Sequence, residues 1–295
     1  MKIAQMEERL PSVRALATDC RLCPRVCGVN RLTGELGVCK ITYGPVHSSV
    51  NLHRGEEPPI SGISGSGTIF MTGCNLKCKF CQNFPISQLR HGKSDSVTSL
   101  AADLLKLQQQ GAHNINFVTP THQAASIYEV LLEAFRLGLS IPIVYNCGGY
   151  ESLEMLKLWE GIIDVYLPDI KYGSDNEALK VSGIKEYTKF NRLAILEMQR
   201  QVGQLQLDDA GLAKSGLIIR HLVLPGDLSR STEVLDFIAN EVSPDTYISL
   251  MSQYFPANQA HHHTVLNRRV ERREYNRVVD HLHKLGMYNG WIQPF

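Results

Sequence analysis

The amino-acid sequence predicts an α/β fold built on a parallel sheet, and two observations lead to this prediction. Six short apolar runs along the chain each precede an amphipathic stretch, and strands that alternate with helices in this order form parallel sheets. In addition, 295 residues are enough for one large α/β domain, and barrels of parallel strands use such a length as a single unit.

The expected strands are short and are separated by amphipathic helices. Strands are expected near residues 68–72, 114–118, 141–146, 165–167, 217–222 and 247–250. Helices are expected near residues 97–110, 123–137, 153–160, 186–204 and 231–241. A last amphipathic segment near residues 271–285 is expected to close the fold as a C-terminal helix.

Residues 20–67 differ from the rest of the chain, because they are rich in glycine, proline and polar residues and show little periodicity. This predicts loops that are held together by something other than an apolar core. Four cysteines lie here with the spacing C-x2-C-x3-C-x11-C, at Cys20, Cys23, Cys27 and Cys39. Four thiolates complete a zinc site or saturate an iron–sulfur cluster, and neither leaves an open coordination position. The spacing fits both metals, and the expected role is structure or electron relay.

A second group of cysteines follows the first expected strand, at Cys74, Cys78 and Cys81. A C-x3-C-x2-C run offers three thiolates to a four-iron cluster and leaves one iron open, whereas ordinary electron-transfer clusters have four cysteine ligands. Three thiols can also form part of a zinc knuckle or fill a core. Seven of the eight cysteines fall into the two groups, which random burial would not produce, so the sequence favours a cluster with an open iron.

The three-cysteine run, with Phe80 directly before the third cysteine, resembles the radical S-adenosylmethionine enzymes. The resemblance implies a partial (β/α)6 barrel and a 4Fe-4S cluster whose fourth iron is chelated by the amino and carboxylate groups of S-adenosylmethionine. It also implies that an electron from the cluster cleaves the sulfonium to methionine and a 5′-deoxyadenosyl radical, which abstracts hydrogen from a substrate. Phe80 would then lie beside the cofactor. We expect the N-terminal four-cysteine segment to span residues 1–66 and the partial barrel with its C-terminal helix to span residues 67–295.

Residues at the expected carboxyl ends of strands are candidates for binding S-adenosylmethionine, since parallel barrels gather reactive groups there. Asp169 and Lys171 alternate on one face of an extended segment and provide a carboxylate and an ammonium group. Arg220 lies in an apolar strand and needs an anionic partner, either the methionine carboxylate or a structural Asp or Glu. Asn146 begins a glycine-containing loop in which backbone can approach a ligand closely. Met251 lies on a strand face that can line the adenosine pocket.

Among these enzymes, the segments Asp169-Ile170-Lys171 and 220–226 resemble the activating enzymes of glycyl-radical enzymes, exemplified by the pyruvate formate-lyase activase. The similarity implies an uncharacterised branch related to that activase. Its target would be a glycine backbone of a partner protein, with a small molecule or another peptide as the competing possibility, and its electron donor a low-potential flavodoxin or ferredoxin. Two features depart from the pattern. Residues 119–122 stand where many relatives have Gly-Gly-Glu, and the four extra cysteines precede the three-cysteine run.

The composition is typical of an intracellular enzyme. The net charge of +1 predicts no general attraction to nucleic acid or to anionic membranes. The first nine residues carry acids and lack the apolar core of a signal peptide, and no apolar run has the length needed to span a bilayer. We therefore expect a cytoplasmic protein whose cysteines bind metal rather than form disulfides. The alternative from a different class is a non-catalytic iron–sulfur or zinc protein that binds a partner or senses redox state.

Overall fold

The computed structural model describes residues 2–295 and contains one large, mostly parallel sheet. Six of its strands run parallel in the order β9-β8-β6-β5-β4-β2. They are β2 (Ser66–Met71), β4 (Ile115–Val118), β5 (Ile143–Cys147), β6 (Val165–Pro168), β8 (Ala213–Leu222) and β9 (Tyr247–Met251). These are the six strands expected from the sequence, so the prediction of an α/β fold with a mainly parallel sheet is confirmed.

Four further strands extend the sheet beyond the expected set. β1 (Val46–His53) pairs antiparallel with β2, and β3 (Lys93–Ser94) pairs antiparallel with β1. β7 (Gln206–Leu207) pairs antiparallel with β8, and β10 (Gly290–Ile292) pairs parallel with β9. The sheet therefore runs from β10 at one edge to β3 at the other and does not close into a barrel.

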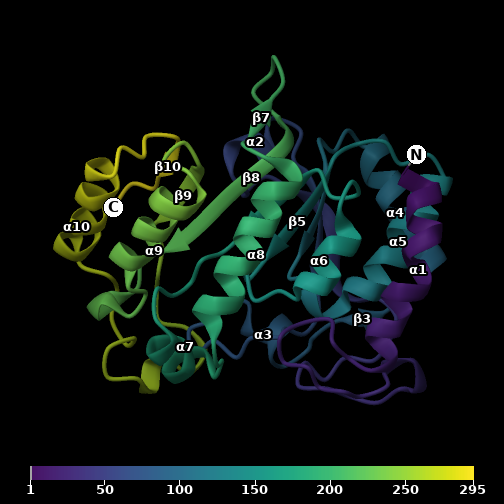
Figure 1. Cartoon of the computed structure of the whole chain (residues 1–295), viewed down its shortest axis with the longest axis horizontal. Coiled ribbons are helices and arrows are strands. Elements are labelled where there is room, and N and C mark those ends of the chain that lie inside the picture. Colours follow the sequence, from purple (N-terminus) through teal and green to yellow (C-terminus); the bar gives the residue numbers. More distant parts are fainter. Residues whose placement is uncertain (1) are drawn as a thin grey trace.

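Most of the main helices begin and end within two residues of the expected positions. They are α1 (Lys2–Thr18), α4 (Val97–Gln109), α5 (Ala124–Arg136), α6 (Leu153–Trp159), α8 (Tyr187–Val202), α9 (Ser231–Phe237) and α10 (Arg272–Lys284). The expected helix at 231–241 is divided into α9 and a π-helical turn, Ile238–Val242. Figure 1 shows α1, α4 and α5 together at one end of the molecule and α9 and α10 beside β9 and β10 at the other.

Three further helices lie in the connections: α2 (Pro58–Ser61), α3 (Phe84–Ser87) and α7 (Asp175–Ser182). Within residues 2–295, no helix combines the length and the apolar character that crossing a membrane requires.

The N-terminal part contains two elements that the sequence prediction missed. α1 packs against α5, yet it contains Pro11 and buries only four side chains, so its apolar pattern is weak. β1 lies in the region expected to consist of loops, and most of its residues are only half-buried. Tertiary packing and strand pairing stabilise both elements, and their own periodicity does not reveal them. The expectation that residues 20–67 are all loops is therefore wrong for β1 at residues 46–53 and for α2 at residues 58–61.

The two faces of the sheet are covered in different ways. Helices such as α4 and α8 pack on its outer face around the main apolar core. The inner face holds a smaller apolar cluster, in which Ile60 of α2 packs with Val144, Leu167 and Ile218. Asn114, directly before β4, donates from Nδ2 to the carbonyl oxygen of Ile60 at 2.7 Å. α2 therefore covers the inner face at the amino ends of the strands.

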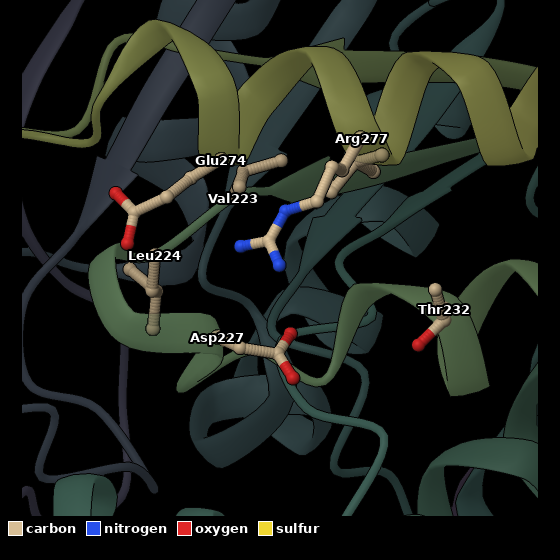
Figure 2. Close-up of a pocket in the computed structure, with 7 residues that line it drawn as sticks. Val223, Leu224, Asp227, Thr232, Glu274 and Arg277 are labelled. Carbon is tan, nitrogen blue, oxygen red and sulfur yellow. The ribbon is translucent and has the colours of Figure 1, made fainter.

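Glu274 joins α10 to the loop after β8. Its carboxylate accepts hydrogen bonds from Arg268 at 2.7 and 2.8 Å, and from the backbone N–H groups of Gly226 and Glu271, each at 2.8 Å. The hydrogen bonds from Arg268 lower the pKa of Glu274 to about 2. In Figure 2, Glu274 and Arg277 extend from α10 toward this loop around a hollow of about 170 Å³.

We expect Glu274→Gln to lower the free energy of unfolding at neutral pH by about 1.5–3 kcal/mol, since it removes a charged hydrogen-bond acceptor. A folded-state pKa below the ordinary value of 4.5 stabilises the protein above that pH, and the contribution is lost as the pH falls toward about 2. Urea denaturation of wild type and variant should therefore give a stability difference that shrinks on acidification. Glu241→Gln, at an exposed position, is the control. A difference that stays constant with pH would contradict the prediction.

Candidate functional site

The three cysteines of the C-x3-C-x2-C run lie at one cavity. Cys74, Cys78 and Cys81, in the loop between β2 and α3, line a cavity of about 230 Å³ at the carboxyl ends of the parallel strands. The residues that the sequence analysis predicts to bind the cofactor all line the same cavity. They are Phe80, Asn146, Asp169, Lys171, Arg220 and Met251. Residues that are far apart in the chain thus converge at this end of the sheet.

The loop that carries these cysteines is held by hydrogen bonds. The backbone N–H of Leu76 points at Sγ of Cys74 at 3.3 Å, and Sγ of Cys81 lies 3.1 Å from Oγ of Ser87. Gly73 begins the loop with a φ of +85°, and a Cβ at this position would lie 2.6 Å from a side chain of the N-terminal segment. Only glycine combines this backbone angle with this close approach.

The thiols provide the donor set of an iron–sulfur cluster. All eight cysteines are free, so no disulfide competes for them. Burial raises the pKa of Cys74 to about 12 and also raises the pKa of Cys78. At neutral pH these thiols therefore ionise when a metal binds them. Among residues 2–295, no three His, Cys, Asp or Glu side chains stand at the spacing of ligands to a single ion. The three cysteines instead surround a space that is large enough for a group of several atoms.

A buried ionic network forms another part of the cavity wall. The carboxylate of Asp169 contacts Nζ of Lys171 and accepts a hydrogen bond from Nε of Arg220 at 2.9 Å. Arg220 also donates to Oδ1 of Asn146 at 2.7 Å and lies 3.7 Å from a carboxylate oxygen of Glu56. The same oxygen of Glu56 accepts a hydrogen bond from Nδ2 of Asn146 at 3.3 Å. Two cationic side chains thus face two carboxyl groups.

The charges of Asp169, Lys171 and Arg220 persist at neutral pH despite burial. Burial opposes ionisation of Asp169, but Arg220 and Lys171 outweigh it and hold the pKa of Asp169 below its ordinary value. Burial also opposes the protonated forms of Lys171 and Arg220, yet Asp169 raises the pKa of both above their ordinary values. At Glu56, burial outweighs the effect of Arg220 and raises the pKa. The network therefore presents fixed charges to a ligand.

The sequence leaves the partner of Arg220 open, and the structure provides Asp169 and Glu56. Glu56 lies just before α2, and no motif or periodicity marks it, so sequence reasoning missed it. Its contact with Arg220 depends on how the chain places α2 under the sheet.

His221, the neighbour of Arg220, points to the opposite face, where its ring contacts a backbone carbonyl at 2.6 Å and Oγ of Ser231 at 2.9 Å. It is a structural histidine.

The loop after β5 contains a buried carboxyl group that the sequence analysis did not single out. Glu151 accepts a hydrogen bond from Oγ1 of Thr121 at 2.7 Å and another from the hydroxyl of Tyr145 at 3.1 Å. Burial raises the pKa of Glu151 to about 7. Cys147, the last residue of β5, and Gly148 of the loop line the cavity. Glu151 thus joins the loops after β4 and β5 next to the cavity wall, and its ionisation changes near neutral pH.

The four N-terminal cysteines lie at a separate and much smaller cavity. Cys20, Cys23, Cys27 and Cys39 line a space of about 10 Å³. Asn75, the residue after Cys74, lines this space as well. The two groups of cysteines are therefore close neighbours in the fold, although each has its own cavity.

Comparison with known sequences identifies relatives over most of the chain. The family model described as "Radical SAM superfamily" matches residues 68–238. An uncharacterised protein of Methanocaldococcus jannaschii, MJ0674, is 33% identical over 274 residues, which cover 89% of this chain and 73% of that protein.

Solved structures show a related fold. A radical SAM methyltransferase from Sphaerobacter thermophilus matches with a TM-score of 0.52 at 12% sequence identity, over 77% of this chain and 66% of that chain. Streptococcus suis SuiB, in a structure bound to the precursor peptide SuiA, matches with a TM-score of 0.48 at 11% identity, over 74% of this chain and 46% of that chain. This chain thus spans less than two thirds of the length of either protein.

Proposed function

Because the chain belongs to the radical SAM superfamily, we propose that it cleaves S-adenosylmethionine reductively and then abstracts a hydrogen atom from a substrate. The ligands of the 4Fe-4S cluster in this proposal are Cys74, Cys78 and Cys81. The observation that carries it is the single cavity that these three thiols share with the Asp169 network. When bound there, the cluster and S-adenosylmethionine together supply the one-electron cleavage chemistry of the superfamily.

The ionic network suits a ligand that carries both charges. Lys171 and Arg220 offer N–H donors to a carboxylate, and Asp169 offers acceptor oxygens to an ammonium group or to hydroxyls. Since the cations already face Asp169 and Glu56, a zwitterionic amino-acid group can bind without burying excess charge. The network therefore orients the methionine part of the ligand.

Apolar side chains complete the cavity wall. Phe80, Leu76, Leu222 and Met251 line it together with the polar groups. Phe80 is itself held in place by an edge contact with Tyr254, whose ring centre is 5.8 Å away. Such walls exclude water from the ligand and shield reactive species from solvent.

For the class of target, we favour a glycine backbone of a partner protein, with a low-potential flavodoxin or ferredoxin as electron donor. The support is the similarity of Asp169-Ile170-Lys171 and of residues 220–226 to the activating enzymes of glycyl-radical enzymes. Incubation of the reduced protein with a candidate glycyl-radical enzyme should give the electron paramagnetic resonance signal of a glycyl radical. Consumption of S-adenosylmethionine that depends on a small molecule instead would assign the other class of target.

We expect anaerobically reconstituted, reduced protein to form 5′-deoxyadenosine from S-adenosylmethionine, and the variant Cys74→Ala/Cys78→Ala/Cys81→Ala to form none. The reason is that the variant lacks all three ligands of the cluster. Product is measured by liquid chromatography, and iron and sulfide content are measured on the same samples.

Lys171→Gln is the matched control, since it keeps the three cysteines. We expect it to retain iron and sulfide but to bind S-adenosylmethionine more weakly. Product formation by the triple variant would contradict the assignment of the ligands. A cluster-loaded wild type that neither binds nor consumes S-adenosylmethionine would contradict the proposed function.

A further inference from the structure

A buried cation without an acidic partner lies at the cavity of the four N-terminal cysteines. Arg31 is only 2% exposed and lines this cavity. Its guanidinium donates hydrogen bonds to the carbonyl oxygens of His122, Ile41 and Thr42, and its Nε has no hydrogen-bond partner within residues 2–295. None of the ion pairs found among residues 2–295 includes Arg31. A buried guanidinium without a counter-charge is costly, so an anionic group is expected beside it.

The cavity wall contains another unsatisfied polar atom. His122 lines the cavity and is only 1% exposed, and its Nδ1 has no hydrogen-bond partner among the described residues. Its Nε2 lies 2.7 Å from the carbonyl oxygen of Thr72. Buried polar atoms are nearly always satisfied in folded proteins. Two such atoms at one cavity indicate that a polar or charged group belongs there.

The four cysteines enclose this cavity although they come from two loops. Cys20, Cys23 and Cys27 precede the short helix Arg31–Thr33, and Cys39 follows it. The backbone N–H of Val38 points at Sγ of Cys27 at 3.4 Å. A Cβ on Gly37 would lie 3.0 Å from the same sulfur. The two loops therefore lie in contact at the sulfur of Cys27, where a metal would join them.

We propose that Cys20, Cys23, Cys27 and Cys39 bind one zinc ion. Four thiolates around Zn²⁺ form a tetrahedral centre with a net charge of about −2, which compensates Arg31 and the neighbouring Arg25. The space at these four cysteines, about 10 Å³, is far smaller than the cavity of about 230 Å³ at Cys74, Cys78 and Cys81. It therefore suits a single ion better than the eight inorganic atoms of a 4Fe-4S cluster.

Binding of the ion changes the local geometry and protonation. The four thiols release their protons to solvent, and the sulfurs move inward to about 2.3 Å from the ion. This movement is required because, in the described part of the chain, no three cysteines stand at the spacing of ligands to one ion beforehand.

The zinc ion holds the N-terminal loops against the loop that carries Cys74. Nε of Arg25 donates to the carbonyl oxygen of Asn75 at 2.7 Å, and Nδ2 of Asn75 donates to the carbonyl oxygen of Tyr150 at 2.8 Å. A Cβ on Gly73 would meet the side chains of Ile41 and His122, so the residue before Cys74 also rests on this segment. The ion thus has a structural role that does not depend on cleavage of S-adenosylmethionine.

The test uses Cys74→Ala/Cys78→Ala/Cys81→Ala protein, in which the other cluster cannot form. The protein is produced with both iron and zinc in the medium and purified without oxygen, and zinc, iron and sulfide are measured per chain. We expect about one zinc ion per chain and neither iron nor sulfide. Iron with sulfide in place of zinc, or no metal at all, would overturn the proposal. Failure of the proposed function would not affect this result.

Two further measurements locate the ion. Adding Cys20→Ser and Cys23→Ser to the triple variant should remove the zinc, whereas adding Cys147→Ser, at a buried cysteine outside both groups, should leave it. Zinc that persists without Cys20 and Cys23 would refute the site. Should the Cys20→Ser/Cys23→Ser protein fail to fold, Co²⁺ substitution in the triple variant decides. The absorption spectrum should show thiolate-to-cobalt charge transfer and tetrahedral ligand-field bands, and a spectrum without thiolate ligation would count against the proposal.

Discussion

Replacing Arg220 by methionine is expected to lower the free energy of unfolding by about 3–5 kcal/mol, because it removes one partner of a buried ion pair. The variant leaves Asp169 paired with Lys171 alone and removes the ion pair between Glu56 and Arg220. Binding of S-adenosylmethionine should be lost as well, since the amino-acid part of the ligand loses a donor. Urea denaturation at neutral pH measures the first effect, and isothermal titration of the cluster-loaded protein measures the second.

Arg200 provides a matched control, because it forms ion pairs with Glu160 and Glu197 on the surface, where its side chain is 52% exposed. Exposed pairs contribute little, so Arg200→Met should cost much less stability than Arg220→Met. A double-mutant cycle adds a sharper criterion. Glu56→Gln should be destabilising in wild type but less so beside Arg220→Met, since the unpaired carboxyl is then removed. If Arg220→Met and Arg200→Met lowered the free energy of unfolding equally, the buried ion pair would contribute no more than an exposed one, and the prediction would be wrong.

Replacing Glu151 by glutamine is expected to make the protein more stable at alkaline pH relative to wild type. In the folded protein the pKa of Glu151 is about 7, against an ordinary value of 4.5, because of burial. A carboxyl group with a raised pKa contributes stability that is complete below the unfolded value and is lost as the pH rises through the folded value. A pKa shift of this size means that wild type loses about 3 kcal/mol of unfolding free energy as the pH rises from 4.5 to values above 7.

The measurement is the unfolding free energy of wild type and Glu151→Gln across this pH range. The variant minus wild-type difference should rise by about 2–3 kcal/mol with pH, since glutamine does not ionise. Glu154→Gln serves as control, because Glu154 lies three residues further along the chain in an exposed pair with Arg21. If the unfolding free energies of wild type and Glu151→Gln changed with pH in the same way, the raised pKa of Glu151 would be contradicted.

The sequence located most of the fold because the six parallel strands and the helices after them bury strongly apolar faces. It missed α1 and β1, whose side chains are mostly half-buried or exposed and whose stability comes from contacts with α5 and β2. The π-helical turn after α9 could not be predicted from the sequence either, since its residues continue the helical pattern. Elements that depend on partners elsewhere in the chain have no local signature.

The candidate site divides in the same way. Cys74, Cys78 and Cys81 can be found by their spacing in the sequence. Asp169 and Lys171 can be found because they follow the end of a predicted strand. Glu56 could not be found, because its contact with Arg220 arises only when α2 folds under the sheet. Glu151 follows a glycine pair that the sequence analysis associated with a ligand, yet its burial among hydroxyl groups depends on Thr121 from the preceding loop.

The unclosed sheet has two free edges, and free edges expose backbone groups that can pair with other chains. At one edge, β10 is only three residues long. At the other edge, β3 covers the first residues of β1, and a bulge between His47 and Ser49 interrupts the regular ladder of β1. Short edge strands and bulges are features by which proteins avoid strand-to-strand aggregation. A sheet that stays open to form its cavity is in this way protected from polymerising through its edges.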